Sequence, residues 1–479
     1  MAKDPILDRV ILQLTERDVL RFRDLTEGGC LTLGGLGAGK TTTVGRMAAM
    51  SFLQGPYGGL ILTVKSDETE RWIQYVRTAG REKDLFVFGP GSPLSFDPLA
   101  YMSATGQSAG LTESIAELLN TLLAVGKVYQ PSSGERYFED AVAELVRAAV
   151  VLLVNAEEPL AITSIYAVLS SLPREPAEIE SPEWQNSSEC ARIIGKLRQR
   201  KDNFTPARWS DLDVAIGHLL EKFPTLDPRT RSNVESTLSG LCSKFLYEPF
   251  RSLFCSGRCD FTPEQTTHEH KLILVSMPVL EFGRDTARLC QVLMKLVFAR
   301  GWLRHQYQPG CCHGAFLYID EAAFLMSRMD SYFHMVCRSS AIAPFLLMQN
   351  ILSIAADEFG EQTPGSKTLG FLGLIATKVF LANNETLTNE YASNQIGREF
   401  RFIDGWSAGE SDNRSHTGVS GSKQLTHLIE PIEFTRLLKP DGENPLSEGV
   451  VYQSGRAFNA TKTRNRPQGL PFLRVHFSR

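Results

Sequence analysis

The sequence predicts an α/β fold with a mainly parallel sheet, interrupted by an all-helical insertion. Seven short apolar runs predict the sheet, because strands that helices cover on both faces are apolar throughout. A glycine-rich turn directly after the first run is typical of a parallel sheet that binds a ligand at its edge. A change to helical periodicity in the middle of the chain predicts the insertion. The seven runs are 30–33, 60–64, 85–88, 272–275, 316–319, 345–348 and 378–381.

The middle of the chain, from about residue 101 to residue 260, has little strand character. Helical spacing of apolar residues is clearest in 111–123, 137–154 and 234–245. We therefore expect two domains. Residues 1–100 and 265–479 would form one discontinuous domain around the sheet, and residues 101–264 would form an all-helical domain.

Composition places the chain among cytoplasmic globular proteins. Of 479 residues, 43% are hydrophobic and 22% are charged, which excludes a disordered polyelectrolyte and a polytopic membrane protein. The best candidate for a membrane span, the apolar run 145–156, contains Arg147 and is shorter than the roughly 20 residues needed to span a bilayer. Nine cysteines without a secretory signal predict reduced thiols. With a net charge of −4, contact with nucleic acid would have to come from a local basic patch.

A phosphate-binding loop is predicted between the first apolar run and the helical segment 42–50. The residues fit G-x-x-x-x-G-K-[ST], in which backbone N–H groups and the helix N-terminus hold phosphates. Lys40 would contact the β- and γ-phosphates of ATP, and Thr41 would ligate Mg²⁺. A plain strand-to-helix turn is the alternative, but such a turn does not require the Lys-Thr pair. The expected nucleotide-binding residues are Gly34, Gly35, Leu36, Gly37, Ala38, Gly39, Lys40, Thr41 and Thr42.

Two adjacent acids, Asp320 and Glu321, directly follow the apolar run 316–319. An acid at the end of a buried strand is the usual second magnesium group of such a site, so Asp320 would hold Mg²⁺ through water. Glu321 would accept the proton of the water that attacks the γ-phosphate. The alternative is that both acids cap the following helix.

These motifs resemble those of the HerA/FtsK superfamily of ring-forming ATPases, and within it the TraD/TraG/TrwB group of type IV secretion coupling proteins. Three further segments carry the resemblance: Leu62-Thr63-Val64-Lys65-Ser66-Asp67, Ser95-Phe96-Asp97-Pro98-Leu99 and residues 373–383. The resemblance implies a RecA-like P-loop NTPase domain, ATP and Mg²⁺ as cofactors, and assembly into a homo-oligomer, expected to be a hexamer. It also implies a DNA translocase that serves conjugative DNA transfer. We expect the protein to bind DNA through contacts with the DNA backbone.

The same resemblance implies two more catalytic residues. Gln349 occupies the place of the family's strand-end glutamine, which senses the γ-phosphate, and Arg338 that of an arginine finger directed at a neighbouring subunit. From the residues alone, Gln349 could equally pair with backbone at a strand end, and Arg338 could be a solvated helix arginine.

The chain departs from the family at its start, since members usually begin with transmembrane helices and only 33 residues, many of them charged, precede Gly34. We expect either a lost membrane domain or a naturally soluble relative, recruited to the inner membrane only through a partner. The protein partner would be a relaxosome, secretion-channel or nuclease component. Two alternatives stay open: a soluble HerA-like translocase that works with a nuclease in DNA processing or defence, and a nucleotide-controlled platform that recruits protein substrates.

Three weaker patterns remain. Two clusters of basic residues could contact phosphates, although a charge run usually marks a solvated face. Cys255, Cys259, His268 and His270 have a spacing that matches no strong zinc template, so we expect no metal there. The basic clusters are Arg192, Lys196, Arg198, Arg200, Lys201 and Arg208, and Arg456, Lys462, Arg464, Arg466, Arg474 and Arg479.

Overall fold

The computed structural model describes residues 4–105, 110–125, 133–356, 360–411 and 414–478. Within these ranges, nine strands form one sheet in the order β13-β12-β9-β3-β8-β7-β4-β6-β5. The seven strands from β3 to β9 are mutually parallel, and β12 and β13 extend one edge in antiparallel fashion. The predicted fold class is thereby confirmed. The strands are β3 (Cys30–Leu33), β4 (Gly58–Thr63), β5 (Leu85–Phe88), β6 (Leu272–Ser276), β7 (Ala315–Ile319), β8 (Ile342–Met348), β9 (Thr377–Leu381), β12 (Leu446–Gln453) and β13 (Phe472–Ser478).

All seven apolar runs of the sequence coincide with these parallel strands, although Val64 of the run 60–64 lies one residue past the end of β4. The central ones are buried at every position, as their apolar composition requires. The helices that pack around the sheet are α1 (Phe22–Thr26), α2 (Arg46–Leu53), α3 (Ser66–Thr78), α13 (Pro263–His268), α14 (Val279–Phe282), α15 (Arg284–Leu303), α16 (Asp330–Val336), α17 (Ile351–Ile354), α18 (Ser366–Leu374) and α19 (Thr386–Ile396).

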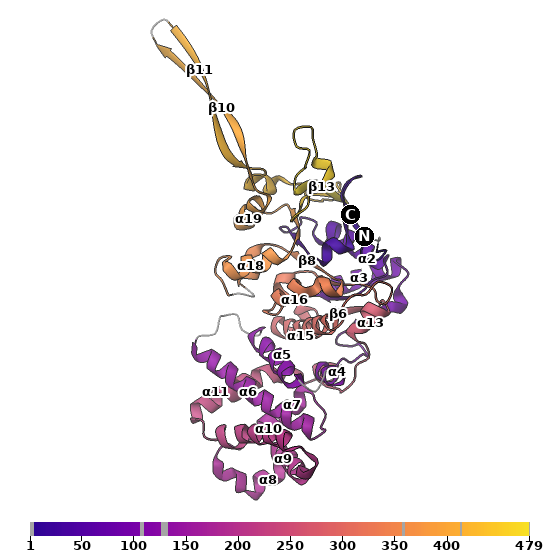
Figure 1. Cartoon of the computed structure of the whole chain (residues 1–479), viewed down its shortest axis with the longest axis vertical. Coiled ribbons are helices and arrows are strands. Elements are labelled where there is room, and N and C mark those ends of the chain that lie inside the picture. The colour runs from indigo at the N-terminus through magenta and orange to yellow at the C-terminus, as the bar shows by residue number, and fades with distance from the viewer. Residues whose placement is uncertain (1–3, 106–109, 126–132, 357–359, 412–413, 479) are drawn as a thin grey trace.

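A helical region lies on one side of the sheet, at the bottom of Figure 1. Side chains cap several of its helices; Asp227, for example, accepts hydrogen bonds from the backbone N–H groups of Arg229 and Thr230 at the start of α11. The three segments with helical spacing lie in α5, in α6, and in α11 with the turn that follows it. The region comprises α4 (Pro98–Thr105), α5 (Leu111–Val125), α6 (Ser133–Asn155), α7 (Ile162–Ser170), α8 (Pro182–Ser187), α9 (Glu189–Gln199), α10 (Pro206–Gly217), α11 (Pro228–Cys242) and α12 (Phe250–Phe254).

Helix α15 lies between the sheet and the helical region (Figure 1). Most of its residues are buried, including the polar Gln291 and Lys295, because both of its faces are covered. Arg300 connects it to α5 by donating to the Ser114 carbonyl at 2.8 Å and to the Glu117 carboxylate at 2.7 Å. None of the helices in the described ranges combines the length and the apolar character needed to cross a membrane.

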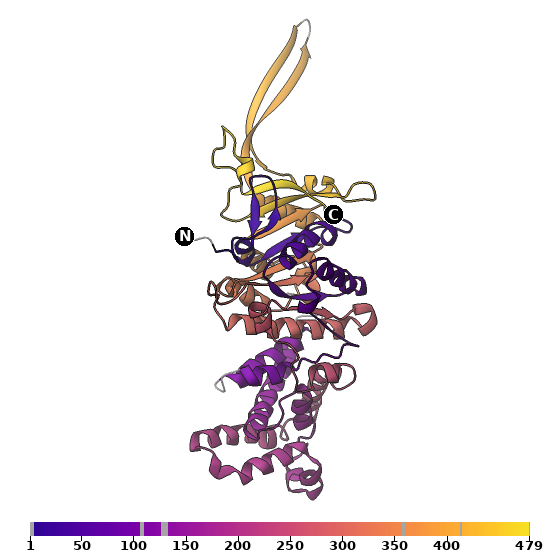
Figure 2. The same cartoon turned by 90° about the vertical axis from the view of Figure 1, so that its right-hand side faces the viewer.

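Besides the β12–β13 pair at the edge of the sheet, two further antiparallel hairpins were not predicted from the sequence. The first pairs β1 (Val10–Gln13) with β2 (Val19–Arg21). The second is a ribbon of β10 (Arg398–Ser411) and β11 (Arg414–His427), which projects from the end of the molecule opposite the helical region (Figures 1 and 2). Glycine, serine and charged residues interrupt both ribbon strands, so no continuous apolar run predicts them.

Candidate nucleotide site

The predicted phosphate-binding loop joins β3 to a wide helical turn, Thr41–Gly45, which continues as α2. Gly37 and Gly39 have φ angles of 69° and 92°, a conformation that favours glycine. The loop is tied to its neighbours at its start, because the Gly35 N–H donates to the Ala382 carbonyl at 2.8 Å. The glycines therefore fix a curled backbone at the carboxyl edge of the sheet.

The ammonium of Lys40 lies across the start of this loop. It donates to the carbonyls of Gly34 at 2.7 Å and Gly35 at 3.2 Å, and only 8% of the residue is exposed. Burial lowers the pKa of Lys40, while the nearby carboxylates of Glu321 and Asp320 oppose that shift. A buried ammonium next to curled backbone N–H groups is suited to an anionic phosphate ligand.

Asp320 lies directly beyond β7 and contacts the loop. The Thr41 hydroxyl donates to Oδ2 of Asp320 at 2.6 Å, and the Glu321 N–H donates to Oδ1 at 2.9 Å. Burial raises the pKa of Asp320, and the Thr41 hydrogen bond opposes the increase. A hydroxyl and a carboxylate are hard oxygen donors of the kind that Mg²⁺ takes together with nucleotide phosphates, so this pair fits the predicted ion.

Glu321 has a left-handed backbone, with φ at 52°, and its side chain does not cap the turn that follows. Instead, Gln349 Nε2 lies 3.3 and 3.4 Å from its two carboxylate oxygens, and Lys65 Nζ lies 3.3 Å from one of them. The backbone carbonyl of Gln349 accepts a 2.8 Å hydrogen bond from the Asn383 side chain. Glu321 is thus held by contacts with residues from two other strand ends.

Strand order explains this convergence. The strands β3, β8, β7 and β4 are consecutive neighbours in the sheet, and all four are parallel. The loop, Gln349, the acidic pair and Lys65 follow these four strands in that order. Carboxyl ends of parallel strands share one edge, which is where α/β folds bind their ligands.

Solved structures with this architecture are known. An unbound form of the bacterial conjugative coupling protein TrwBdeltaN70 superposes with a TM-score of 0.61 at 13% identity, covering 98% of this chain and 90% of that one. The plasmid coupling protein TrwB in complex with ADP and Mg²⁺ gives a TM-score of 0.59 at 13% identity, with the same coverage. This chain has a TrwB-like fold. No family model matches the sequence, and no curated protein matches it.

Two residues of the site in this TrwB-like fold were not assigned a role from the sequence. Lys65 directly precedes α3, Glu68 lies in its first turn, and their side chains lie 3.4 Å apart. Glu68 is 4% exposed and accepts a hydrogen bond from the Val64 N–H at 3.2 Å. Burial raises the pKa of Glu68 to about 7, and the Asp320 carboxylate adds to the increase. Charged residues directly after the apolar run 60–64 were the available signal.

Arg338 is not brought to the loop within the chain. It lies in the turn before β8, at the amino edge of the sheet, whereas the loop lies at the carboxyl edge. Its side chain is 73% exposed and lies 3.4 Å from Glu27. The assignment of Arg338 as an arginine finger stays a prediction.

Several residues of each basic cluster pair with acids. In the helical region, Arg192 and Lys196 both contact Glu158, at 3.1 and 2.8 Å. Near the C-terminus, Arg474 pairs with Glu433 at 3.1 Å and Glu448 at 3.4 Å. Arg456 and Arg466 likewise pair with Asp24 and Glu399. These contacts favour the interpretation as solvated faces, while Arg479 lies outside the described residues.

Cys255, Cys259, His268 and His270 are not part of a candidate metal cluster. Among the described residues, no cluster of three or more His, Cys, Asp or Glu side chains could hold a metal ion. The thiols of Cys255 and Cys259 point to backbone carbonyls, those of Phe245 and Asp97. Burial raises the pKa of Cys255 to about 12, as for an inert thiol.

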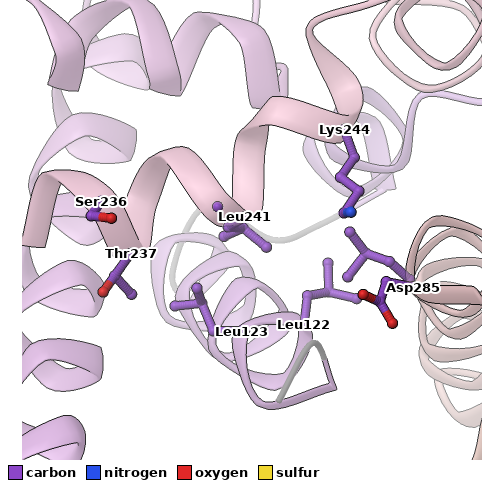
Figure 3. Close-up of a pocket in the computed structure, with 9 residues that line it drawn as sticks. Leu122, Leu123, Ser236, Thr237, Leu241, Lys244 and Asp285 are labelled. Carbon is purple, nitrogen blue, oxygen red and sulfur yellow. The ribbon is translucent and has the colours of Figure 1, made fainter. Parts of the chain in front are cut away.

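A cavity of about 260 Å³ lies where the helical region meets α15 (Figure 3). Leu122 and Leu123 of α5, Leu241 of α11 and Asp285 of α15 are among its lining residues. None of the predicted nucleotide-site residues lines it. The cavity is therefore separate from the loop that would hold phosphates.

Proposed function

We propose that this protein is a Mg²⁺-dependent P-loop ATPase. The observation that carries the proposal is the convergence of Lys40, Thr41, Asp320, Glu321 and Gln349 at one edge of the sheet. A strand-to-helix turn without catalytic function would need neither the Lys-Thr pair nor a buried acid, Asp320, within hydrogen-bond distance of Thr41.

Each group has a distinct role in this proposal. The backbone N–H groups of residues 34–42 and the Lys40 ammonium bind the phosphates of ATP, while Thr41 and Asp320 hold Mg²⁺, which neutralises phosphate charge when bound. Glu321 accepts a proton from the water whose oxygen attacks the γ-phosphorus, and the bond to the β–γ bridging oxygen breaks to release ADP. Gln349, whose side chain contacts the Glu321 carboxylate, senses the γ-phosphate.

We further propose that the chain acts in a ring, expected to be a hexamer, that moves DNA in conjugative transfer. Support comes from the TrwB-like fold over nearly the whole chain, since that protein is named a bacterial conjugative coupling protein. The exposed position of Arg338 also suits contact with a neighbour's nucleotide. In this proposal, residues 1–100 and 265–479 form the motor domain, and the ring grips the DNA backbone without strong sequence preference.

A recruiting platform is the second candidate. The helical domain, proposed as 101–264, contributes none of the described contacts at the nucleotide site, which favours a separate task. That task would be binding a relaxosome, secretion-channel or nuclease component. A nuclease partner would correspond to a HerA-like role in DNA processing or defence.

The test is ATP turnover by the wild type and the Glu321→Gln variant, with and without single- and double-stranded DNA at low salt. Glu183→Gln, in α8 of the helical region, is the matched control. We expect turnover that DNA stimulates, a fall of about 10²- to 10⁴-fold in Glu321→Gln, and no change in the control. Turnover that ignores both DNAs would favour the platform, and absence of turnover would reject the ATPase.

A further inference from the structure

Lys65 is a charged side chain at the site that the mechanism above does not use. Its Nζ lies 3.3 Å from Glu321 Oε1 and 3.4 Å from Glu68 Oε1. The Lys65 side chain is 53% exposed, in contrast to 26% for Glu321 and 5% for Glu68. The ammonium therefore bridges two carboxylates that are both less exposed than it is.

We propose that Lys65 is a positioning residue that fixes the carboxylate of Glu321 for proton transfer, and that Glu68 in turn anchors Lys65. This inference rests on the proposed ATPase function. It adds a group from β4 to a site whose other members follow β3, β7 and β8.

The contact between Lys65 and Glu321 follows from the register of the sheet. Strands β4 and β7 are adjacent and parallel, with Leu62 paired to Ile319. Both strands end near this pair, so Lys65 and Glu321 lie side by side at the same edge of the sheet. Glu68 is placed by α3, whose first turn brings its carboxylate back to the Val64 N–H.

Two donors that follow the strands on either side of β7 contact the Glu321 carboxylate. Gln349, after β8, approaches it from one neighbouring strand, and Lys65, after β4, from the other. A carboxylate with a single donor can rotate about its side-chain torsions, whereas two donors from separate strands restrict that rotation. Loss of Lys65 should therefore slow the chemical step without weakening nucleotide binding, because Lys40 and the loop bind the phosphates.

The exposed position of Lys65 makes it suitable for testing. Half-exposed ion pairs contribute little to stability, so Lys65 variants should fold. Lys65→Met does leave the buried Glu68 carboxylate without its cation, and the double variant Lys65→Met/Glu68→Gln removes that charge. Lys83, an exposed lysine in the turn before β5, supplies the matched control Lys83→Met.

The experiment measures kcat and KM for Mg-ATP and the affinity for a fluorescent ADP analogue. We expect Lys65→Met and the double variant to lower kcat about tenfold, as for coupled contact residues, with KM and ADP affinity unchanged. Lys65→Arg should restore most of the rate, since it keeps a cation within reach, and Lys83→Met should match the wild type.

A double-mutant cycle with Glu321→Gln decides whether Lys65 acts through Glu321. In the Glu321→Gln background, Lys65→Met should cause almost no further loss, because the group it positions is already gone. A full additional tenfold loss, a wild-type rate in Lys65→Met, or a change confined to KM would overturn the proposal. Absence of ATP turnover in the wild type would instead reject the proposed function itself.

Discussion

The hydroxyl of Thr41 donates a 2.6 Å hydrogen bond to Oδ2 of Asp320, although 279 positions separate the two residues in the chain. Thr41 begins the helical turn after the loop, and Asp320 directly follows β7. The whole helical region lies between them in the sequence. The sheet closes this gap by placing the ends of β3, β8 and β7 at one edge.

The contact between Thr41 and Asp320 predicts how ATP turnover depends on the Mg²⁺ concentration. Asp320→Asn removes the negative charge, and Thr41→Val removes the hydroxyl with little change in shape. Each should raise the Mg²⁺ concentration that half-saturates ATP turnover by about 10- to 100-fold, the cost usual for groups that hold or orient a metal. Titration of turnover with Mg²⁺ measures this.

Thr121→Val is the matched control for that titration, because the Thr121 hydroxyl donates to the Glu117 carbonyl within α5 of the helical region. It should leave the Mg²⁺ requirement unchanged. Variants of Thr41 and Asp320 with the wild-type Mg²⁺ requirement would show that the pair does not hold the ion.

Arg338 gives a prediction about assembly. If it completes a neighbour's site, Arg338→Ala should lose about 10³- to 10⁵-fold in turnover, and only in assembled protein. Mixing Arg338→Ala chains with Lys40→Ala chains should restore part of the activity, since the second chain supplies the arginine and the first an intact loop. Turnover of the mixed assemblies, compared with each variant alone, is the measurement.

Arg229→Ala, at the start of α11, is the control for the same assay and should behave as wild type. Unchanged turnover in assembled Arg338→Ala would make Arg338 a solvated arginine paired with Glu27.

Most of the parallel sheet and of the candidate nucleotide site could be predicted from the sequence, because both depend on local patterns. Apolar runs determine β3 to β9, and the glycine-rich loop and acidic pair each occupy consecutive residues. The contact of Lys65 with Glu321 could not be predicted, since it depends on the order of the strands and not on spacing along the chain. The acidic partners of Arg474 could not be predicted for the same reason. No acid follows residue 448 in the sequence, and the fold brings Glu433 and Glu448 into contact with Arg474.

A buried lysine in β9 predicts a pH-dependent stability. Lys378 is 2% exposed, and its ammonium donates to the Ile375 carbonyl at 2.5 Å. Burial lowers the pKa of Lys378 from 10.5 to about 8. Below pH 8 both folded and unfolded states are protonated, and the folded state bears the full cost of the buried charge. As the pH rises from 8 to 10.5, only the unfolded state keeps the proton, so this group's contribution to stability increases.

Lys378→Met should therefore raise the free energy of unfolding at pH 7, by at most about 3 kcal/mol, and by clearly less at pH 10. Urea unfolding at both pH values measures the difference, with the exposed Lys367→Met as control. An equal effect at the two pH values would contradict the role of a buried charge.

A buried ion pair connects α15 to the segment that follows Asp320 and Glu321. Lys295 Nζ lies 2.5 Å from Asp330 Oδ2, and the two side chains are 1% and 4% exposed. Asp330 also accepts hydrogen bonds from the backbone N–H and the hydroxyl of Ser327. Through this pair, the helix that contacts α5 also holds the start of α16, nine positions after Glu321.

Breaking one side of this pair should be costly. Lys295→Met leaves the Asp330 carboxylate buried without a countercharge and should lower the free energy of unfolding by about 3–5 kcal/mol. The double variant Lys295→Met/Asp330→Leu removes both charges and should recover much of that loss, because a buried pair replaced by apolar residues costs little. Urea unfolding of the two single variants and the double variant measures the coupling. Simple addition of the two single losses would show that the charges stabilise the fold independently of each other.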